Sequence, residues 1–172
     1  IIKMENEKPY GMGVFIDIYP YDGLGTTEKE AVTYGMKGDR LSSLCYQSTR
    51  EHFAIETTTS LFRKIIKYPI FIGSKLMGKD YFQKKLNQLV ELKEYEDSNY
   101  IGCVVWLSGG KKEIFLRKWF DETVMVPFEK YQFRVPKDYD EVLRHTYGDY
   151  MQLPPEKDRI GHHYFKAYRK DE

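Results

Sequence analysis

The apolar pattern of the chain begins with a strand signal at residues 14–19, where β-branched and aromatic side chains follow one another up to Pro20. Side chains alternate between the two faces of a strand, so Asp17 shares its face with aromatic neighbours. A carboxylate in such a strand costs free energy unless it is paired or binds a metal ion. Asp17 is therefore the most conspicuous residue of this segment. The Asp22-Gly23 pair that follows predicts a turn.

A helical pattern follows this first strand. Thr27 is a suitable helix cap, and Glu30 stands three residues later, as in a capping box. The pattern up to about Ser48 is only loosely helical, because Gly35 and Gly38 interrupt it. We therefore expect a helix start at Thr27 but an irregular continuation.

The middle of the chain predicts two more helices. One begins near residues 58–59, and Pro69 is expected to kink or end it before the apolar segment resumes as far as Met77. The other covers residues 79–95, where apolar side chains recur at helical spacing. We expect these apolar stripes to form core rather than a cofactor surface.

Strand patterns return after this helical region. Residues 101–107 form a compact apolar run, and residues 123–128 and 131–135 predict a hairpin. Pro136 stands at an expected helix start, and Gly148 ends that helix.

Together these elements predict an α+β fold in a single domain of 172 residues. A small mixed sheet is expected to combine the strand of Asp17, the 101–107 strand and the hairpin. Helices are expected to pack around it.

Charge narrows the possible partners. The formal net charge is +1, whereas a nucleic-acid-binding domain is usually strongly basic, so we expect no nucleic-acid partner. Between Thr58 and Lys93, however, eight basic residues stand against two acidic ones, a local net charge of +6. Two interpretations remain open for this stretch. It is a solvated helical face, or it is a surface that meets anionic lipid or an anionic glycan polymer.

The two cysteines, Cys45 and Cys103, are far apart and show no metal-binding spacing, which predicts neither a disulfide framework nor a zinc site. This usage suits a reducing compartment such as the cytoplasm. We see no signal peptide and no apolar stretch long enough to span a bilayer.

Motif-level chemistry is sparse without further comparison. The chain has no phosphate-binding loop, no nucleophile elbow and no HExxH pair. His162 and His163 are adjacent, so their rings point in different directions in regular structure, which makes a shared metal site a weak hypothesis. His145 is interpreted as a structural residue rather than a ligand.

Three ordered blocks nevertheless resemble the LicD family of phosphotransferases. Residues 13–24, GVFIDIYPYDGL, are similar to the family segment G-[IV]-F-I-D-I-F-P-L-D-G-L, and residues 96–102, EDSNYIG, are similar to E-D-S-K-Y-[IV]-G. The third block follows the family in order from Trp119-Phe120 through residues 126–129, 135–140, 143–144 and 147–155 to Arg159 and His162-His163.

The resemblance implies a nucleotidyltransferase-like fold and the transfer of phosphocholine or a related phospho-alcohol from a CDP-activated donor, such as CDP-choline, to a cell-surface glycan sugar. Capsule, lipopolysaccharide and teichoic acid are the acceptor classes. The enzyme would be bacterial and cytoplasmic, with a possible peripheral contact to the anionic membrane surface. Such a reaction uses Mg²⁺ or Mn²⁺, for which carboxylate oxygens are suitable ligands.

The resemblance also assigns roles to individual residues. Asp17 is expected to bind the metal ion or to accept the proton of the acceptor hydroxyl. Asp22 is interpreted mainly as a turn residue, with metal ligation as the alternative. Two interpretations remain open for the closing block. Residues 147–155 form a helix end and a tight turn packed on the sheet, or Arg159, His162 and His163 lie at the edge of the cleft. In the second case Arg159 would hold phosphate oxygens of the donor, and His162 or His163 would act as acid, base or hydrogen-bond donor.

The glycine-rich GGTLLG turn and the acidic PWDDDID run of the family are absent from this sequence. We therefore expect the carboxyl-terminal portion of a LicD-type transferase, inactive by itself. Residues 1–25 would supply the strand with the third carboxylate, residues 26–95 a variable basic helical region, and residues 96–172 the carboxyl-terminal block.

Two alternatives remain open. The chain is a non-catalytic module that binds a glycan acceptor or an anionic partner, with Trp106, Trp119 and the tyrosines stacking on sugars. Otherwise, the same mechanism transfers another phospho-alcohol, such as ribitol or glycerol phosphate.

Overall fold

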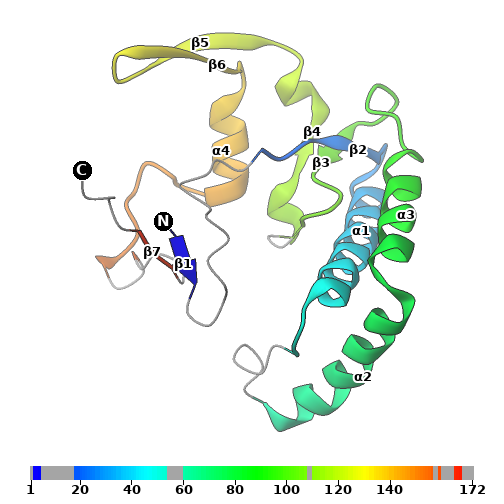
Figure 1. The fold of residues 1–172 in the computed structure, drawn as a ribbon. Coiled ribbons are helices and arrows are strands. Elements are labelled where there is room, and N and C mark those ends of the chain that lie inside the picture. Colours follow the sequence, from blue (N-terminus) through cyan, green and yellow to red (C-terminus); the bar gives the residue numbers. More distant parts are fainter. Residues whose placement is uncertain are drawn as a thin grey trace. The chain divides into compact units, whose positions relative to one another are not determined.

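A computed structural model describes residues 2–4, 18–53, 60–107, 110–156, 159 and 165–167 (Figure 1). The chain divides into two compact units, residues 20–148 and residues 1–19 with 149–172, and each is described by itself. Asp17, His162 and His163 lie outside the described residues.

The described residues of the larger unit form four α-helices and five strands. The helices are α1 (Glu28–Thr49), α2 (Leu61–Met77), α3 (Lys79–Val90) and α4 (Tyr139–Tyr147). The strands are β2 (Asp22–Gly25), β3 (Tyr100–Gly102), β4 (Ile114–Leu116), β5 (Thr123–Phe128) and β6 (Tyr131–Pro136). Two short 3₁₀ helices, η1 (Gly110–Glu113) and η2 (Arg117–Phe120), flank β4.

Helix α1 begins as its sequence predicts and then continues without interruption. The Thr27 side chain accepts a hydrogen bond from the Glu30 backbone N–H, which confirms the cap. The expected irregularity at Gly35 and Gly38 is wrong, because both glycines lie buried inside one helix of 22 residues. Their small size lets α1 approach the 103–107 segment closely, since a side chain at Gly38 would collide with Val104.

Helix α2 contains Pro69 and does not end there. Proline removes one backbone hydrogen-bond donor, but the helix continues past Pro69 and runs from Leu61 to Met77. The hairpin of β5 and β6 is confirmed, with Glu129 in the left-handed region (φ 52°) at its turn. Helix α4 ends before Gly148, as predicted.

The sheets differ from the expectation in two respects. Strands β2, β3 and β4 form a three-stranded antiparallel sheet in that order, and β5 and β6 form a separate pair, so no mixed sheet is present among the described strands. The predicted turn at Asp22-Gly23 is also wrong, because both residues belong to β2. The absence of a side chain at Gly23 instead lets β2 lie close to Ser98, because a Cβ added at Gly23 would lie only 2.5 Å from Ser98 Oγ. The α+β class itself is confirmed.

The core of this unit lies between the three-stranded sheet and the paired helices α1 and α3. Its most buried members come from both sides of that contact: Leu24, Ala31, Leu89, Val104, Leu107 and Ile114. In the smaller unit, β1 (Ile2–Met4) pairs antiparallel with β7 (Phe165–Ala167). Cys45 and Cys103 are free thiols. Within the described part of the chain, no helix has both the length and the apolar character that crossing a membrane requires.

Candidate ligand-binding site

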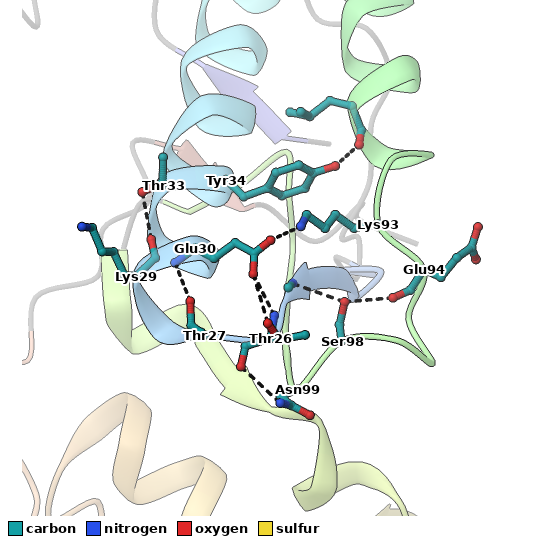
Figure 2. Close-up of polar contacts among 12 residues, drawn as sticks. Thr26, Thr27, Lys29, Glu30, Thr33, Tyr34, Lys93, Glu94, Ser98 and Asn99 are labelled. Atoms are coloured by element: carbon teal, nitrogen blue, oxygen red, sulfur yellow. Dashed lines mark hydrogen bonds and ion pairs between the residues drawn. The ribbon is translucent and has the colours of Figure 1, made fainter.

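Two of the sequence blocks pair directly in the fold. Strand β2, which ends the first block, is hydrogen-bonded to β3, which ends the second, with Asp22 opposite Gly102 and Gly23 opposite Ile101. Figure 2 shows how the second block is tied to the start of α1. The Gly25 N–H donates to Ser98 Oγ at 3.2 Å, and Asn99 Nδ2 donates to the Thr26 carbonyl at 3.1 Å.

Ser98 and Asn99 therefore have structural roles. The Ser98 hydroxyl is 2% exposed and also donates to the Glu94 carbonyl at 2.9 Å, which closes the turn before β3. These contacts fix the sheet against the amino-terminal end of α1.

Glu30 links the same helix end to the segment after α3. Lys93 donates a hydrogen bond to its carboxylate, as does the backbone N–H of Thr26 at 3.0 Å (Figure 2). The Lys93 hydrogen bond, with a smaller contribution from Thr26, lowers the pKa of Glu30 below its ordinary value. The Tyr34 hydroxyl donates to the Leu89 carbonyl, a second link between α1 and α3.

A cavity of about 250 Å³ opens beside this anchored end of α1. Its lining combines two large aromatic rings, one carboxylate, one ammonium, one imidazole and three aliphatic side chains. They are Glu28, Val32, Tyr100, Lys111, Ile114, Leu116, Trp119 and His145. We call this space the Trp119 cavity.

The lining of the Trp119 cavity comes from α1, β3, η1, β4, η2 and α4. Ile114 and Leu116 share one face of β4 because side chains alternate along a strand, and Tyr100 is the direct cross-strand partner of Leu116. Trp119 follows on η2. One wall of the cavity is therefore built on the paired strands β3 and β4, and the short helix that follows β4 adds Trp119.

Its charged groups form one ion pair. Lys111 Nζ lies 2.7 Å from Glu28 Oε1, and both side chains are more than half exposed. The hydrogen bond from Lys111 and its positive charge lower the pKa of Glu28, so this carboxylate is ionised at neutral pH. An exposed ion pair of this kind contributes little free energy. A ligand cation can therefore replace the Lys111 ammonium beside Glu28 at a small cost in free energy.

His145 attaches α4 to the wall of this cavity. Its Nε2 atom lies 2.9 Å from the Lys111 carbonyl oxygen. Its ring centroid lies 5.6 Å from that of Phe115 and 5.6 Å from that of Trp119, both in edge-to-face geometry. The interpretation of His145 as structural fits these contacts, although its ring also lines the cavity.

Asp22 lies at the start of β2 in a half-buried position. Burial raises the pKa of its carboxyl group above the ordinary value. The described residues provide it with no hydrogen-bond donor and no cationic partner. Burial also raises the pKa of the nearby Cys103 thiol, which keeps that thiol protonated and unsuited to act as a nucleophile.

The expected metal site receives one candidate ligand from the described chain. A half-buried carboxylate without a cationic partner fits a divalent cation, and its oxygen atoms are the ligand type that Mg²⁺ prefers. Asp17 lies outside the described residues. Among the residues that the structure describes, no group of three His, Cys, Asp or Glu side chains is arranged to hold a metal ion.

Arg159 belongs to the smaller unit. There its Nε donates to the Pro154 carbonyl at 2.8 Å, and its backbone N–H donates to Glu156. Of the two tryptophans, Trp119 lines the cavity described above, whereas Trp106 is 52% exposed and does not.

Sequence reasoning did not identify the Trp119 cavity. Tyr100 and Trp119 lie inside the second and third sequence blocks, so the family resemblance pointed to these two residues of the cavity. Glu28 and Lys111 are 83 residues apart, and no local pattern relates them. Only the folding of η1 against the start of α1 brings that pair together.

Comparisons with known proteins give one relative. No family model matches the chain, and no solved structure matches it. The chain is 32% identical over 157 residues to the lipopolysaccharide cholinephosphotransferase LicD of Haemophilus influenzae (strain Rd), an alignment that covers 90% of this chain and 57% of that relative. The chain thus spans little more than half the length of the relative. Over this aligned region, the comparison confirms the resemblance to the LicD family that the three sequence blocks indicate.

Proposed function

We propose that the protein takes part in the transfer of phosphocholine from CDP-choline to a sugar of lipopolysaccharide. The relative is named a lipopolysaccharide cholinephosphotransferase. The proposal applies to the whole transferase, with the Trp119 cavity as its choline-binding part. We place the reaction in the cytoplasm, in keeping with two unpaired cysteines.

One observation carries this proposal: the composition of the Trp119 cavity suits a quaternary ammonium group. Trp119 and Tyr100 provide two aromatic rings in the lining, and Glu28 provides a carboxylate. A cation held against an aromatic ring gains about 0.5–2 kcal/mol, and quaternary ammonium groups are recognised by aromatic residues in this way. The trimethylammonium group of choline would replace the Lys111 ammonium beside Glu28.

The bond changes follow from the donor. The acceptor hydroxyl oxygen forms a bond to the phosphorus that carries choline, the bond from that phosphorus to the bridging oxygen breaks, and CMP leaves. The hydroxyl proton passes to a base, for which we propose Asp17 or one of His162 and His163. Arg159 is the proposed partner of phosphate oxygens. A bound Mg²⁺ or Mn²⁺ ion, with Asp22 and Asp17 as candidate ligands, would neutralise the diphosphate charge.

A competing function has support from the same cavity. Tyrosine and tryptophan side chains stack on sugar rings, and Trp119 and Tyr100 both line the cavity. A non-catalytic glycan-binding module would therefore use the same residues for an uncharged ligand. The two functions differ in whether the Glu28 charge matters.

The test is a fluorescence titration with a single reporter. The sequence has two tryptophans, so Trp106→Phe leaves Trp119 as the only indole. We expect phosphocholine to change its emission in a saturable manner and phosphoethanolamine, which lacks the three methyl groups, to bind at least about tenfold more weakly. Glu28→Gln in this background should weaken phosphocholine binding by about tenfold. Glu141→Gln, an exposed carboxylate on α4, is the matched control and should leave it unchanged.

Absence of any phosphocholine response would refute the choline site. A response to lipopolysaccharide oligosaccharide that is equal in Glu28→Gln and the parent would assign the cavity to the glycan-binding function. For the metal, Asp22→Asn in the full-length transferase should remove the Mg²⁺ dependence of CDP-choline binding while phosphocholine still binds to the Trp119 cavity.

A further inference from the structure

Helix α2 exposes its apolar side chains. At about 100° per residue, eight large apolar residues of α2 fall on one continuous half of the helix circumference. All of them are 40–84% exposed. We call this set the apolar face of α2: Leu61, Phe62, Ile65, Ile66, Ile70, Ile72, Leu76 and Met77.

The opposite side of α2 faces the body of the protein. Its only buried residues are Phe71 (6% exposed) and Ser74 (3% exposed). The Phe71 ring packs against that of Phe53, with centroids 5.7 Å apart. Lys75 Nζ donates to the Arg50 carbonyl at the end of α1 at 2.5 Å. A helix of a soluble domain normally turns its apolar stripe to the core, and α2 does the reverse.

The charges of α2 all have one sign. It carries Arg63, Lys64, Lys67 and Lys75, and no acidic residue between Leu61 and Met77. On the helix circumference, Arg63 borders the apolar face beside Ile70, and Lys75 lies near its other border. An apolar half with basic residues at its edges is the arrangement of helices that lie in the surface of an anionic membrane. The long basic side chains reach the lipid headgroups from there.

We infer that α2 is a membrane-contact helix, which lies in the plane of an anionic lipid surface with its apolar face among the acyl chains and its basic residues at the phosphate groups. Charge complementarity selects lipid over another protein surface, because four cations without an anion fit a uniformly anionic plane. Contiguous apolar surface of this extent is uncommon on monomeric proteins unless it meets a partner.

Vesicle flotation tests this assignment without donor or acceptor, so its result does not depend on the proposed transfer reaction. We expect the protein to float with vesicles of phosphatidylcholine containing 30% phosphatidylglycerol and to bind pure phosphatidylcholine much more weakly. Ile65→Glu with Leu76→Glu, two exposed positions at the centre of the apolar face, should lower the partition coefficient at least tenfold. Arg63→Ala, at the border of the apolar face, should lower it about fivefold, on anionic vesicles only.

Leu92→Glu with Met125→Glu is the matched control, because both side chains are more than half exposed and lie outside α2. It should bind vesicles like the parent protein, and circular dichroism should show all variants folded. Equal loss of binding in the control would overturn the inference, as would failure of the parent to float. A dimer that dissociates on Ile65→Glu substitution, with no vesicle binding, would also overturn it, by assigning the apolar face to a second copy of the chain.

Discussion

Replacing Gly38 by alanine tests how closely α1 packs on the sheet. An alanine Cβ at this position would overlap the Val104 carbonyl oxygen and lie 2.6 Å from Val104 Cγ1. Val104 is fully buried, and a backbone carbonyl cannot rotate away as a side chain can. The helix must therefore shift, and such overpacking costs about 1–3 kcal/mol.

Two other helical glycines provide matched controls. At Gly35 an added Cβ would meet Leu107 Cδ2 at 2.6 Å, the far end of a flexible side chain, with the next atom at 3.6 Å. At Gly73 it would meet nothing within 4 Å. Alanine gains about 1 kcal/mol over glycine in a helix interior, so Gly73→Ala should stabilise by about that amount and Gly35→Ala by less.

The expected net effect of Gly38→Ala is therefore a loss of about 0–2 kcal/mol of unfolding free energy. Because Gly35→Ala should stabilise slightly, the two variants should differ by about 2 kcal/mol. For a chain of this size, that gap corresponds to roughly 4–8 °C in Tm. Urea unfolding followed by far-ultraviolet circular dichroism measures the free energy directly. If Gly38→Ala were as stable as Gly35→Ala, the close contact between α1 and Val104 would be wrong.

Three further predictions concern stability. Ser98→Ala leaves the Gly25 N–H without its acceptor and should cost about 1–3 kcal/mol in urea unfolding, whereas the exposed Ser43→Ala should cost little. Because the pKa of Glu30 is lowered, its ionised carboxylate stabilises the folded state at pH values above its ordinary pKa of 4.5. This stabilisation is lost as the pH falls through the lowered pKa. The difference in urea midpoint between the parent and Glu30→Gln should therefore shrink on acidification, and a constant difference would contradict the Lys93 contact. Because burial raises the pKa of Asp22, Asp22→Asn should raise the Tm at pH 7; a lower Tm would show that the charge has a stabilising partner.

The sequence predicted those structural elements that depend on residues adjacent in the chain. The Thr27 cap, the β5–β6 hairpin and the end of α4 at Gly148 depend on neighbouring residues, and all three were predicted from sequence. The prediction that Gly35 and Gly38 interrupt the helix is wrong, because a glycine inside a helix can allow close packing against a segment distant in sequence. For Gly38 that segment contains Val104, and only the tertiary fold places it there.

The same limit applies to the candidate site. The 22–23 dipeptide has the composition of a turn, but pairing with β3 extends it into a strand. The Trp119 cavity depends on Glu28 and Lys111, whose contact is set by the tertiary fold alone. Asp17, His162 and His163, which the family resemblance selects, stay predictions because they lie outside the described residues.

In the proposed transfer reaction, the length of α1 would set a geometric limit on the acceptor. Its first turn carries Glu28 of the Trp119 cavity, and its last residues adjoin α2 through Arg50 and Lys75 (Figure 1). With 22 residues at about 1.5 Å each, α1 acts as a rigid spacer of about 33 Å. If α2 lies in the lipid surface, the choline group and the sugar that receives it meet no farther than about this height above the bilayer. Lipid-linked glycans whose acceptor sugar lies within that height of the bilayer would then be the preferred acceptors.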